Sequence, residues 1–313
     1  MQNSEKSLNL YYDLAHAPNS YDFGVFLSIG ITVGRASGFD GFRSVIVADR
    51  FRRTGAESEF SDQYSAKKLV DIFPAIAQLF PQINQFEISR CRDKCLVSPY
   101  FPRCFGDPML PQISASSPWP HNFIHLEQLY KRYGSIALIK IERELAGDSS
   151  YVTISPRGGA MNKARNTSNE VLREAINSAR SVYKGKRIVL VPDKESLGAV
   201  SSLDSDIEVS WAAGVSLIDR MQLYAAAEVN ILFSSGPSAL VLLSEFPFIF
   251  LGMLNSKVPI SSRDYFRRKG PSFGLQLPWL RGDQVIDWNE SDKYRESGFV
   301  ANILRSYEKA RGT

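Results

Sequence analysis

Short apolar runs alternate with helical segments along the second half of the sequence, and this alternation limits the available folds more than any other feature. The run from Val229 to Phe233 leads into Ser234–Ser238, a helix-like stretch follows, and another apolar run begins at Phe248. Runs of this length, rich in β-branched and aromatic residues, are typical of strands buried on both faces. Strands that alternate with helices predict parallel sheets with helices on both faces.

Further segments extend this alternation to the rest of the chain. Thr167–Glu170 matches a capping box, in which a hydroxyl and a carboxylate bond the free amides of a helix start. In the second half we expect further strands at 151–155, 187–191 and 207–211, and helices from the capping box to about 182 and over 216–227. In the first half we expect strands at 8–14, 44–48, 86–89 and 135–141, helices over 21–34, 64–80 and 125–132, and a long loop over 91–122.

The chain length suits two sheets of this kind. A chain of 313 residues is long enough for two domains of ordinary size. We expect an α/β protein with two Rossmann-like open parallel sheets facing across a cleft and joined near residues 142–150. The predicted domains cover residues 1–145 and 146–295, and a terminal helical segment follows at 296–313.

Composition and charge are those of a globular protein without a nucleic-acid-binding arm. The hydrophobic content is 44% and the charged content is 22%, as is usual for soluble chains. The formal net charge of +4 suits acidic small ligands or a membrane surface, but no basic block marks a nucleic-acid partner. The start, MQNSEKSLNL, lacks the apolar core of a signal peptide, and Glu245 and Pro247 interrupt the apolar stretch 238–254. We therefore expect a cytoplasmic protein.

Ser234–Ser238 stand where a buried strand turns into a helix, and this position suits an anion. In open parallel sheets, ligands bind outside the carboxyl ends of the strands. Gly236 lets a ligand approach the backbone, Pro237 fits the first helical turn, and the free amides of a helix start attract phosphate. A plain serine-capped turn is the alternative interpretation. Three hydroxyls would add donors, those of Ser234, Ser235 and Ser238.

A second junction, after the strand at 151–155, carries basic residues. Arg157 and Arg165 lie between the end of this strand and the next helix, and the planar guanidinium fork matches phosphate oxygens. Gly158–Gly159 would let the loop fold close over a ligand, and Lys163 adds a third positive charge. Two junctions with anion-binding chemistry on one sheet edge favour a phosphate site over two solvated polar loops.

The stretch from Trp211 to Gly252 resembles the C-terminal nucleotide-sugar domain of GT-B glycosyltransferases. A helix ending in small residues, Leu223–Ala227, precedes a strand and a Ser/Gly turn, as in that family. The resemblance implies that the turn holds the diphosphate or ribose of the donor, and that Arg157, or else Arg165, contacts the diphosphate. It further implies an acceptor domain at 1–145, a donor domain at 146–295 and a last helix that packs back toward the first domain. UDP-sugar epimerases of the same architecture share the motif.

Two further strand ends could complete a nucleotide site. Asp193 follows the strand at 187–191 and could bond a base or a ribose hydroxyl, although an Asp there is equally typical of a helix cap. Ala213–Val215 follow the strand at 207–211, where related folds hold the base by backbone contacts. We therefore expect Gly214 beside the base, and a plain turn is the alternative.

The first half contains the candidates for a general base. An inverting transferase needs a group that accepts the proton of the acceptor hydroxyl, and His or Asp can serve. His16 and Asp22 flank the turn after the strand at 8–14, and His16 has the better position because it lies just past the strand end. A surface histidine and a helix-capping segment are the alternative interpretations.

Other patterns are weaker, and we expect neither a metal nor a bound cofactor. Cys91 and Cys95 are close enough for a zinc site, but the longer spacing from Cys95 to Cys104, with His121 and His125 after it, fits no zinc pattern. Asp204-Ser205-Asp206 precedes a strand, unlike the metal-binding D-x-D of GT-A enzymes. The sequence contains no G-x-G-x-x-G, no G-x4-G-K-[ST], no H-E-x-x-H and no G-x-S-x-G. These absences remove the simplest cases for a dehydrogenase, a P-loop NTPase, a zincin and an α/β-hydrolase.

The sequence thus predicts a metal-independent glycosyltransferase that moves a sugar from a nucleotide-sugar donor to a glycan or lipid-linked acceptor. A nucleotide-sugar epimerase or hydrolase of the same fold, or a non-catalytic nucleotide-binding protein, remains the alternative. No nucleic-acid partner is expected. The basic and aromatic segment 263–268 fits either a peripheral membrane contact or a solvated basic face.

Overall fold

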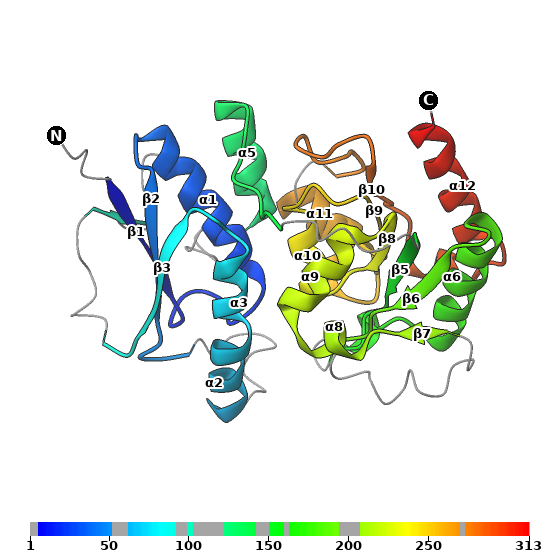
Figure 1. The fold of residues 1–313 in the computed structure, drawn as a ribbon, viewed down its shortest axis with the longest axis horizontal. Coiled ribbons are helices and arrows are strands. Elements are labelled where there is room, and N and C mark those ends of the chain that lie inside the picture. The colour runs from blue at the N-terminus through cyan, green and yellow to red at the C-terminus, as the bar shows by residue number, and fades with distance from the viewer. Residues whose placement is uncertain are drawn as a thin grey trace. The chain divides into compact units, whose positions relative to one another are not determined.

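The computed structural model describes residues 6–51, 62–91, 99–102, 122–141, 150–159, 163–193, 207–269 and 273–312, in two compact units (Figure 1). The first unit comprises Met1–Lys140 and the second comprises Ile141–Thr313. Each unit contains one sheet in which every paired strand is parallel to its neighbour. The predicted fold class of two parallel α/β sheets is therefore confirmed. In the described part of the chain, no helix combines the length and apolarity that a membrane crossing requires.

The sheet of the first unit has the strand order β3-β2-β1-β4, so its first strand lies inside the sheet. Helices α1, α3 and α5 lie on one face of this sheet (Figure 1). Tyr12 of β1 packs against the rings of Phe23, Phe26 and Phe73 in the core. The strands are β1 (Ser7–Asp13), β2 (Gly41–Val47), β3 (Ile83–Ser89) and β4 (Tyr100–Phe101), and the helices are α1 (Asp22–Ala36), α2 (Asp62–Asp71), α3 (Phe73–Gln78) and α5 (Phe123–Tyr133).

Close packing of α1 on its sheet depends on glycine. Gly34 faces Phe42 of β2, and a Cβ at this position would overlap the Phe42 ring. A Cβ at Gly30 would lie 2.9 Å from a methyl group of Leu10 in β1. Two turns of α1 therefore approach the sheet more closely than any larger residue allows.

The sheet of the second unit has the order β10-β9-β8-β5-β6-β7. Its first strand, β5, lies between β6 and β8, and the later strands continue outward on each side. The strand order therefore reverses between β5 and β8, which is where open α/β sheets hold their ligands. The strands are β5 (Tyr151–Ser155), β6 (Arg187–Leu190), β7 (Glu208–Val209), β8 (Val229–Phe233), β9 (Phe248–Leu251) and β10 (Gln284–Ile286).

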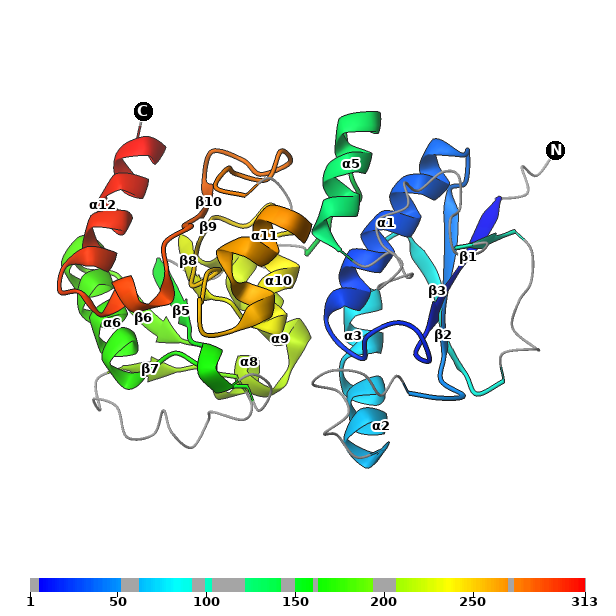
Figure 2. The same cartoon turned by 180° about the vertical axis from the view of Figure 1, so that it is seen from behind.

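Helices cover both faces of this second sheet. Figures 1 and 2 show α6 and α12 on one face and α9, α10 and α11 on the other. The helices are α6 (Asn169–Val182), α8 (Trp211–Val215), α9 (Leu217–Ala226), α10 (Gly236–Val241), α11 (Arg263–Lys269) and α12 (Phe299–Arg311), with short 3-10 turns at Lys163–Arg165, Pro259–Ser261 and Ser291–Arg295.

The last helix, α12, packs within its own unit. Val300, Leu304 and Tyr307 join the apolar cluster that α6 forms over the sheet. The amide of Gly298, just before α12, donates to Glu174 of α6 at 2.8 Å. The expected packing of the segment 296–313 toward the first domain stays a prediction.

A buried asparagine lies in the middle of the second sheet. Asn230 of β8 is fully buried, and its Oδ1 accepts a 2.6 Å hydrogen bond from Thr153 of β5. Its Nδ2 donates to the carbonyl oxygens of Tyr224 at 3.0 Å and Pro247 at 2.9 Å. The side chain amide therefore ties β8 to β5, to the end of α9 and to the segment before β9.

A buried tyrosine closes the end of β9. The hydroxyl of Tyr294 donates to Asp287 at 2.6 Å and accepts from the amide of Gly252 at 3.1 Å. Gly252 has φ +70°, a conformation that suits glycine. Burial, followed by the charge of Asp287, raises the pKa of Tyr294, so the phenol stays neutral at physiological pH.

Four local expectations were wrong. The predicted strand at 207–211 is limited to Glu208–Val209, and Trp211 already begins α8. The predicted helix at 64–80 is divided at Ile72, just before α3, which carries a proline in its first turn. Strand β4 lies inside the segment predicted to be a loop, 91–122. Residues 135–141 form no strand, and Lys140 donates to the carbonyl oxygen of Leu79 instead.

Candidate functional site

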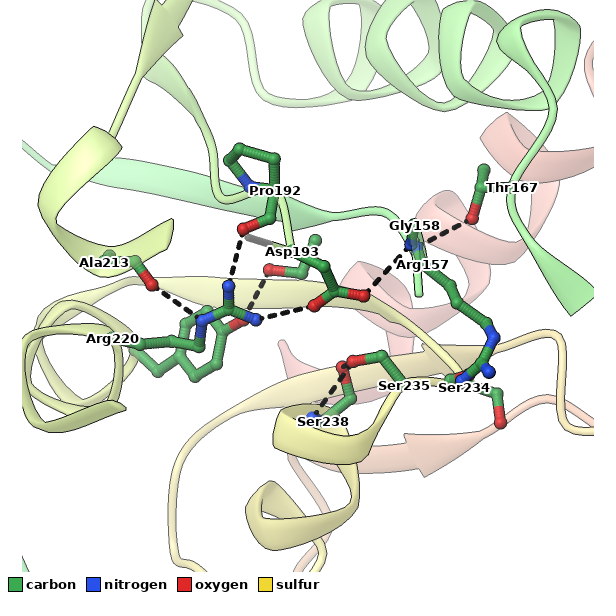
Figure 3. A network of polar contacts seen from close by, with 12 residues as sticks. Arg157, Gly158, Thr167, Pro192, Asp193, Ala213, Arg220, Ser234, Ser235 and Ser238 are labelled. Atoms are coloured by element: carbon green, nitrogen blue, oxygen red, sulfur yellow. Dashed lines mark hydrogen bonds and ion pairs between the residues drawn. The ribbon is translucent and has the colours of Figure 1, made fainter. Parts of the chain in front are cut away.

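The candidate site lies at the carboxyl ends of β5 and β8, where the strand order of the second sheet reverses. Two segments meet there: the chain that follows β5, which contains Arg157, and Ser234–Gly236, which join β8 to α10. Figure 3 shows residues from both segments directed toward one another. The two junctions that the sequence singled out are thus neighbours in the structure.

Arg157 connects the two segments directly. Its Nη1 donates to the carbonyl oxygen of Ser234 at 3.1 Å. Its backbone forms a reciprocal pair with Thr167: the amide of Arg157 donates to the Thr167 hydroxyl at 2.9 Å, and the amide of Thr167 donates to the Arg157 carbonyl at 3.0 Å. A Cβ at Gly159 would lie 3.7 Å from Nη2 of Arg157, so the guanidinium passes close to this glycine.

Arg165 reaches the same serine. Its Nη2 donates to the hydroxyl of Ser234. The short turn that carries Arg165 is held in place because the side chain amide of Asn255 donates to the carbonyl oxygen of Ala164 at 2.9 Å. Asn166 Nδ2 donates to the carbonyl oxygen of Gly159 at 3.0 Å and connects this turn to the loop after β5. Two half-buried guanidinium groups thus converge on one residue, Ser234, which places positive charge beside the start of α10.

The predicted serines at the start of α10 bond one another. Ser235 is the residue before α10, and its hydroxyl accepts from the amide of Ser238 at 3.3 Å. The two hydroxyls lie 2.9 Å apart, and Ser238 is fully buried. Gly236 is the first residue of the helix and is half-buried, so it is the part of this turn nearest to solvent.

Asp193 takes part in a buried network. Its Oδ2 accepts from the amide of Gly158 at 3.0 Å, and its Oδ1 accepts from Nη1 of Arg220 at 3.1 Å. Arg220 also donates from Nε to the carbonyl oxygen of Ala213 at 2.8 Å and from Nη2 to that of Pro192 at 2.6 Å. Only 3% of the Arg220 side chain and 9% of the Asp193 side chain are exposed.

Sequence reasoning missed Arg220, although a signal was present. The buried residues of α9 recur at helical spacing at Leu217, Met221 and Tyr224, and Arg220 lies on this same face. A cation on the apolar face of a helix needs an acid or several carbonyl groups as partners. That mismatch predicts a buried polar network even where the partners are unknown.

Gly214 and Tyr224 lie around this network. Gly214 is buried in α8, next to Ala213, whose carbonyl oxygen accepts from Arg220. The Tyr224 hydroxyl bonds that of Ser155, the last residue of β5. Burial raises the pKa of Tyr224, so this contact joins two neutral hydroxyls.

The two candidate bases of the first unit follow β1, which lies beside β4 where the strand order of that sheet reverses. His16 is exposed, and its amide donates to the carbonyl oxygen of Asp13 at 3.0 Å. Asp22 is half-buried in the first turn of α1 and accepts a 2.7 Å hydrogen bond from the hydroxyl of Ser20. The hydrogen bond from Ser20 therefore holds Asp22 in a defined position.

Five of the potential metal ligands considered in the sequence lie outside the described residues, namely Cys95, Cys104, His121, Asp204 and Asp206. Cys91 is a half-buried free thiol, and the ring of His125 accepts from the amide of Asn122 at the start of α5. Among the residues that are described, no three His, Cys, Asp or Glu side chains gather closely enough to hold a metal ion.

Comparison with known proteins relates the chain to solved glycosyltransferase structures. No protein-family model and no curated protein sequence matches it. The bacterial iron-containing dodecameric glycosyltransferase TibC from enterotoxigenic E. coli H10407 is similar with a TM-score of 0.50 and 15% identity, over 99% of this chain and 77% of TibC. The E. coli ADP-heptose LPS heptosyltransferase II is similar with a TM-score of 0.50 and 10% identity, over 98% of this chain and 100% of that one. The likeness spans nearly the whole chain and shows that it has the fold of these glycosyltransferases, the GT-B fold.

Proposed function

We propose that this protein is a glycosyltransferase that takes its sugar from a nucleoside diphosphate donor. The observation that carries the proposal is the convergence of Arg157 and Arg165 on Ser234 where the strand order reverses. This is the position at which open α/β sheets bind nucleotides, and guanidinium groups are suited to phosphate oxygens. The GT-B fold of the chain agrees with this assignment.

The proposed chemistry needs a cationic site for the leaving group. As the glycosidic bond to the donor breaks, negative charge grows on the diphosphate, and groups already aimed at that charge lower the barrier. Arg157 and Arg165 would supply this stabilisation, together with the backbone amide of Gly236. Because two guanidinium groups can neutralise the diphosphate, we propose that the reaction proceeds without a divalent metal ion.

The acceptor hydroxyl needs a base, and we propose Asp22. Its carboxylate is half-buried and oriented by Ser20, which is the arrangement expected of a positioned base. His16, in the same loop, is the second candidate. The acceptor would be a glycan or a lipid-linked sugar, and neither requires a nucleic-acid partner.

A membrane contact at the cytoplasmic face would suit a lipid-linked acceptor. Arg267 of α11 is exposed and lies over the ring of Phe273 with 5.7 Å to the ring centroid, and Leu275 is 64% exposed. Basic and apolar side chains close together favour a surface of anionic lipid. This part of the proposal concerns where the protein works and leaves the reaction unchanged.

A panel of nucleotide sugars tests the proposed function. The purified protein is incubated with UDP-, GDP- and ADP-linked sugars, and mass spectrometry follows the release of the nucleoside diphosphate. The panel includes ADP-heptose, the donor named for the similar heptosyltransferase II. We expect slow hydrolysis of one donor in the absence of acceptor, unchanged by EDTA.

Other outcomes separate the alternatives. Conversion of the donor to an isomer with the nucleotide still attached would identify an epimerase. Binding without turnover, in the presence of glycan and lipid-linked acceptors, would identify a non-catalytic nucleotide-binding protein. Loss of activity in EDTA that manganese restores would contradict metal independence.

A further inference from the structure

Arg220 occupies an unusual position for a cation. It lies on the buried face of α9, and only 3% of its side chain is exposed. Removing a guanidinium from water is unfavourable unless its charge and its N–H groups find partners. In this structure the partners are the carboxylate of Asp193 and the carbonyl oxygens of Pro192 and Ala213.

These partners come from different parts of the ligand edge. Pro192 and Asp193 follow β6, and Ala213 belongs to α8, which follows β7. Asp193 extends the network further, since its second oxygen accepts from the amide of Gly158 in the loop after β5. Figure 3 shows the Arg220 guanidinium at the centre, with Asp193 between it and Gly158. One side chain therefore connects the segments that follow three neighbouring strands.

The contact at Gly158 bears directly on the anion site. Gly158 follows Arg157, and the amide of Gly158 is part of the peptide unit that contains the Arg157 carbonyl. The same carbonyl accepts from Thr167 on its other side. The backbone of Arg157 is thus fixed by Thr167 and by Asp193, and its side chain is left to reach Ser234.

We propose that Arg220 and Asp193 are positioning residues for the nucleotide site: they hold the loop after β5 so that Arg157 faces the diphosphate, and they hold Ala213 and Gly214 beside the base. The proposal rests on the proposed function. In this proposal Asp193 positions the loop through its hydrogen bond with the Gly158 amide. It does not contact the base or the ribose directly, in contrast to the role considered from the sequence. Arg220 neutralises Asp193 and, through Ala213, links the anion end of the site to the base end.

The first measurement needs no ligand. Hydrogen exchange, read by mass spectrometry, is compared for the wild type, Asp193→Asn and Arg220→Lys. An Asn at position 193 offers one acceptor oxygen in place of two, so it cannot accept from both Gly158 and Arg220. A Lys at position 220 lacks the planar guanidinium fork that reaches Asp193, Pro192 and Ala213 together. We expect faster exchange in the peptides that contain Gly158 and Gly214. Wild-type exchange in these peptides of the folded variants would overturn the proposal.

A control variant separates positioning from a general loss of stability. Gln284→Ala removes a buried side chain at the start of β10. The side chain amide of Gln284 donates to the carbonyl oxygens of Ser244 at 2.7 Å and Phe246 at 3.0 Å. It lies at the amino end of its strand, on the opposite edge of the sheet from the site. We expect Gln284→Ala to lower the melting temperature without changing exchange at Gly158.

The second measurement uses pyrophosphate, ADP and UDP as probes in calorimetry. We expect Asp193→Asn to weaken pyrophosphate binding by roughly 3- to 30-fold, which lies within the range of interaction energies between neighbouring residues. In an Arg157→Ala background the same change should alter the affinity by less than about twofold, because the residue that it positions is absent. Gln284→Ala should bind pyrophosphate as the wild type does.

These experiments distinguish failure of the positioning proposal from failure of the proposed function. If Asp193→Asn weakens binding equally with and without Arg157, the route through Arg157 is wrong. If the wild type binds none of the three probes, the proposed function fails, and the exchange measurement still decides whether Arg220 and Asp193 order the loop. Should Arg220→Lys fail to fold, Asp193→Asn carries the same test alone.

Discussion

Nη1 of Arg157 lies 3.1 Å from the carbonyl oxygen of Ser234, although 77 residues separate them in sequence. The hydrogen bond crosses from the end of β5 to the end of β8. A guanidinium carries five N–H donors in a rigid fork, and a carbonyl oxygen accepts from one of them. The hydrogen bond to Ser234 therefore orients the whole fork at the proposed diphosphate site.

Removing this fork should weaken the binding of nucleoside diphosphates. We expect Arg157→Ala to reduce the affinity for the preferred diphosphate by about 1.5–3 kcal/mol, as for a charge-assisted hydrogen bond. Isothermal titration calorimetry measures the change. Arg187→Ala is a matched control, since it removes the same charge from the amino end of β6, where Arg187 pairs with Glu208. Equal losses in both variants would indicate a general charge effect and no site at Arg157.

Neutralising the candidate base should affect turnover and leave donor binding intact. We expect Asp22→Asn to lower kcat by about 10²–10⁴-fold, the usual contribution of a positioned base, with the Kd of the donor unchanged. Steady-state kinetics with a saturating acceptor, together with donor calorimetry, makes this separation. His16→Ala serves as the comparison. A larger loss of kcat in His16→Ala than in Asp22→Asn would transfer the role to His16.

The buried Tyr294 predicts a loss of stability at alkaline pH. Burial raises the pKa of Tyr294 above its ordinary value of 10.0, so its contribution is complete below pH 10 and declines as pH rises beyond that value. In Tyr294→Phe we expect the free energy of unfolding at pH 7 to fall by about 1–3 kcal/mol, because Asp287 and Gly252 lose a partner. The decline above pH 10 should be shallower than in the wild type. Urea titrations from pH 7 to 11 measure both effects, and an unchanged slope would exclude Tyr294 as a source of the alkaline loss.

The close packing of α1 on β2 should not tolerate a side chain at Gly34. A Cβ at this position would overlap the buried ring of Phe42. We expect Gly34→Ala to destabilise the protein by roughly 1–2 kcal/mol, since overpacking outweighs the better helix propensity of alanine. Gly41→Ala is the control, because a Cβ there would meet no atom closer than 3.6 Å. Thermal melts in which Gly34→Ala equals or exceeds the wild type would contradict close packing at this point.

The sequence predicted four strands of the second sheet, β5, β6, β8 and β9, because these strands are apolar and are separated by helices with clear start signals. It did not predict β10. Ser168 caps α6, one residue after Thr167, where the expected capping box began, and Ser216 caps α9, each with its side chain accepting a backbone amide. The hydroxyl of Thr167 accepts from the amide of Arg157 instead. Both junctions of the candidate site were also predicted, since Arg157 and Gly236 follow two apolar strands. The sequence also predicted that both junctions lie on one edge of the sheet. It did not predict that β5 and β8 are adjacent strands, because strand order is set by packing between distant segments.

The errors have a common physical source. Trp211 looks like a strand residue by propensity, yet it begins α8 because only two residues of β7 pair with β6. Strand β4 has two residues, too few for any periodicity, and it exists because Asn9 and Leu10 of β1 provide a partner. Asp193 illustrates the same limit at the site, since its partner Arg220 is 27 residues away. Short elements and buried ion pairs are decided by tertiary contacts.

Asn230 has a consequence for how the chain avoids a wrong fold. In the native register it pairs with Thr153 of β5 and with Phe248 of β9. A parallel sheet of apolar strands could shift β8 by one residue and still bury nearly the same hydrocarbon surface. In such a misfolded state Asn230 would lose the hydroxyl of Thr153 and leave buried amide groups without partners, which is strongly unfavourable. Ser234 would also move about 3.3 Å along the strand relative to Arg157. The buried amide of Asn230 thus disfavours a one-residue shift of β8 relative to β5.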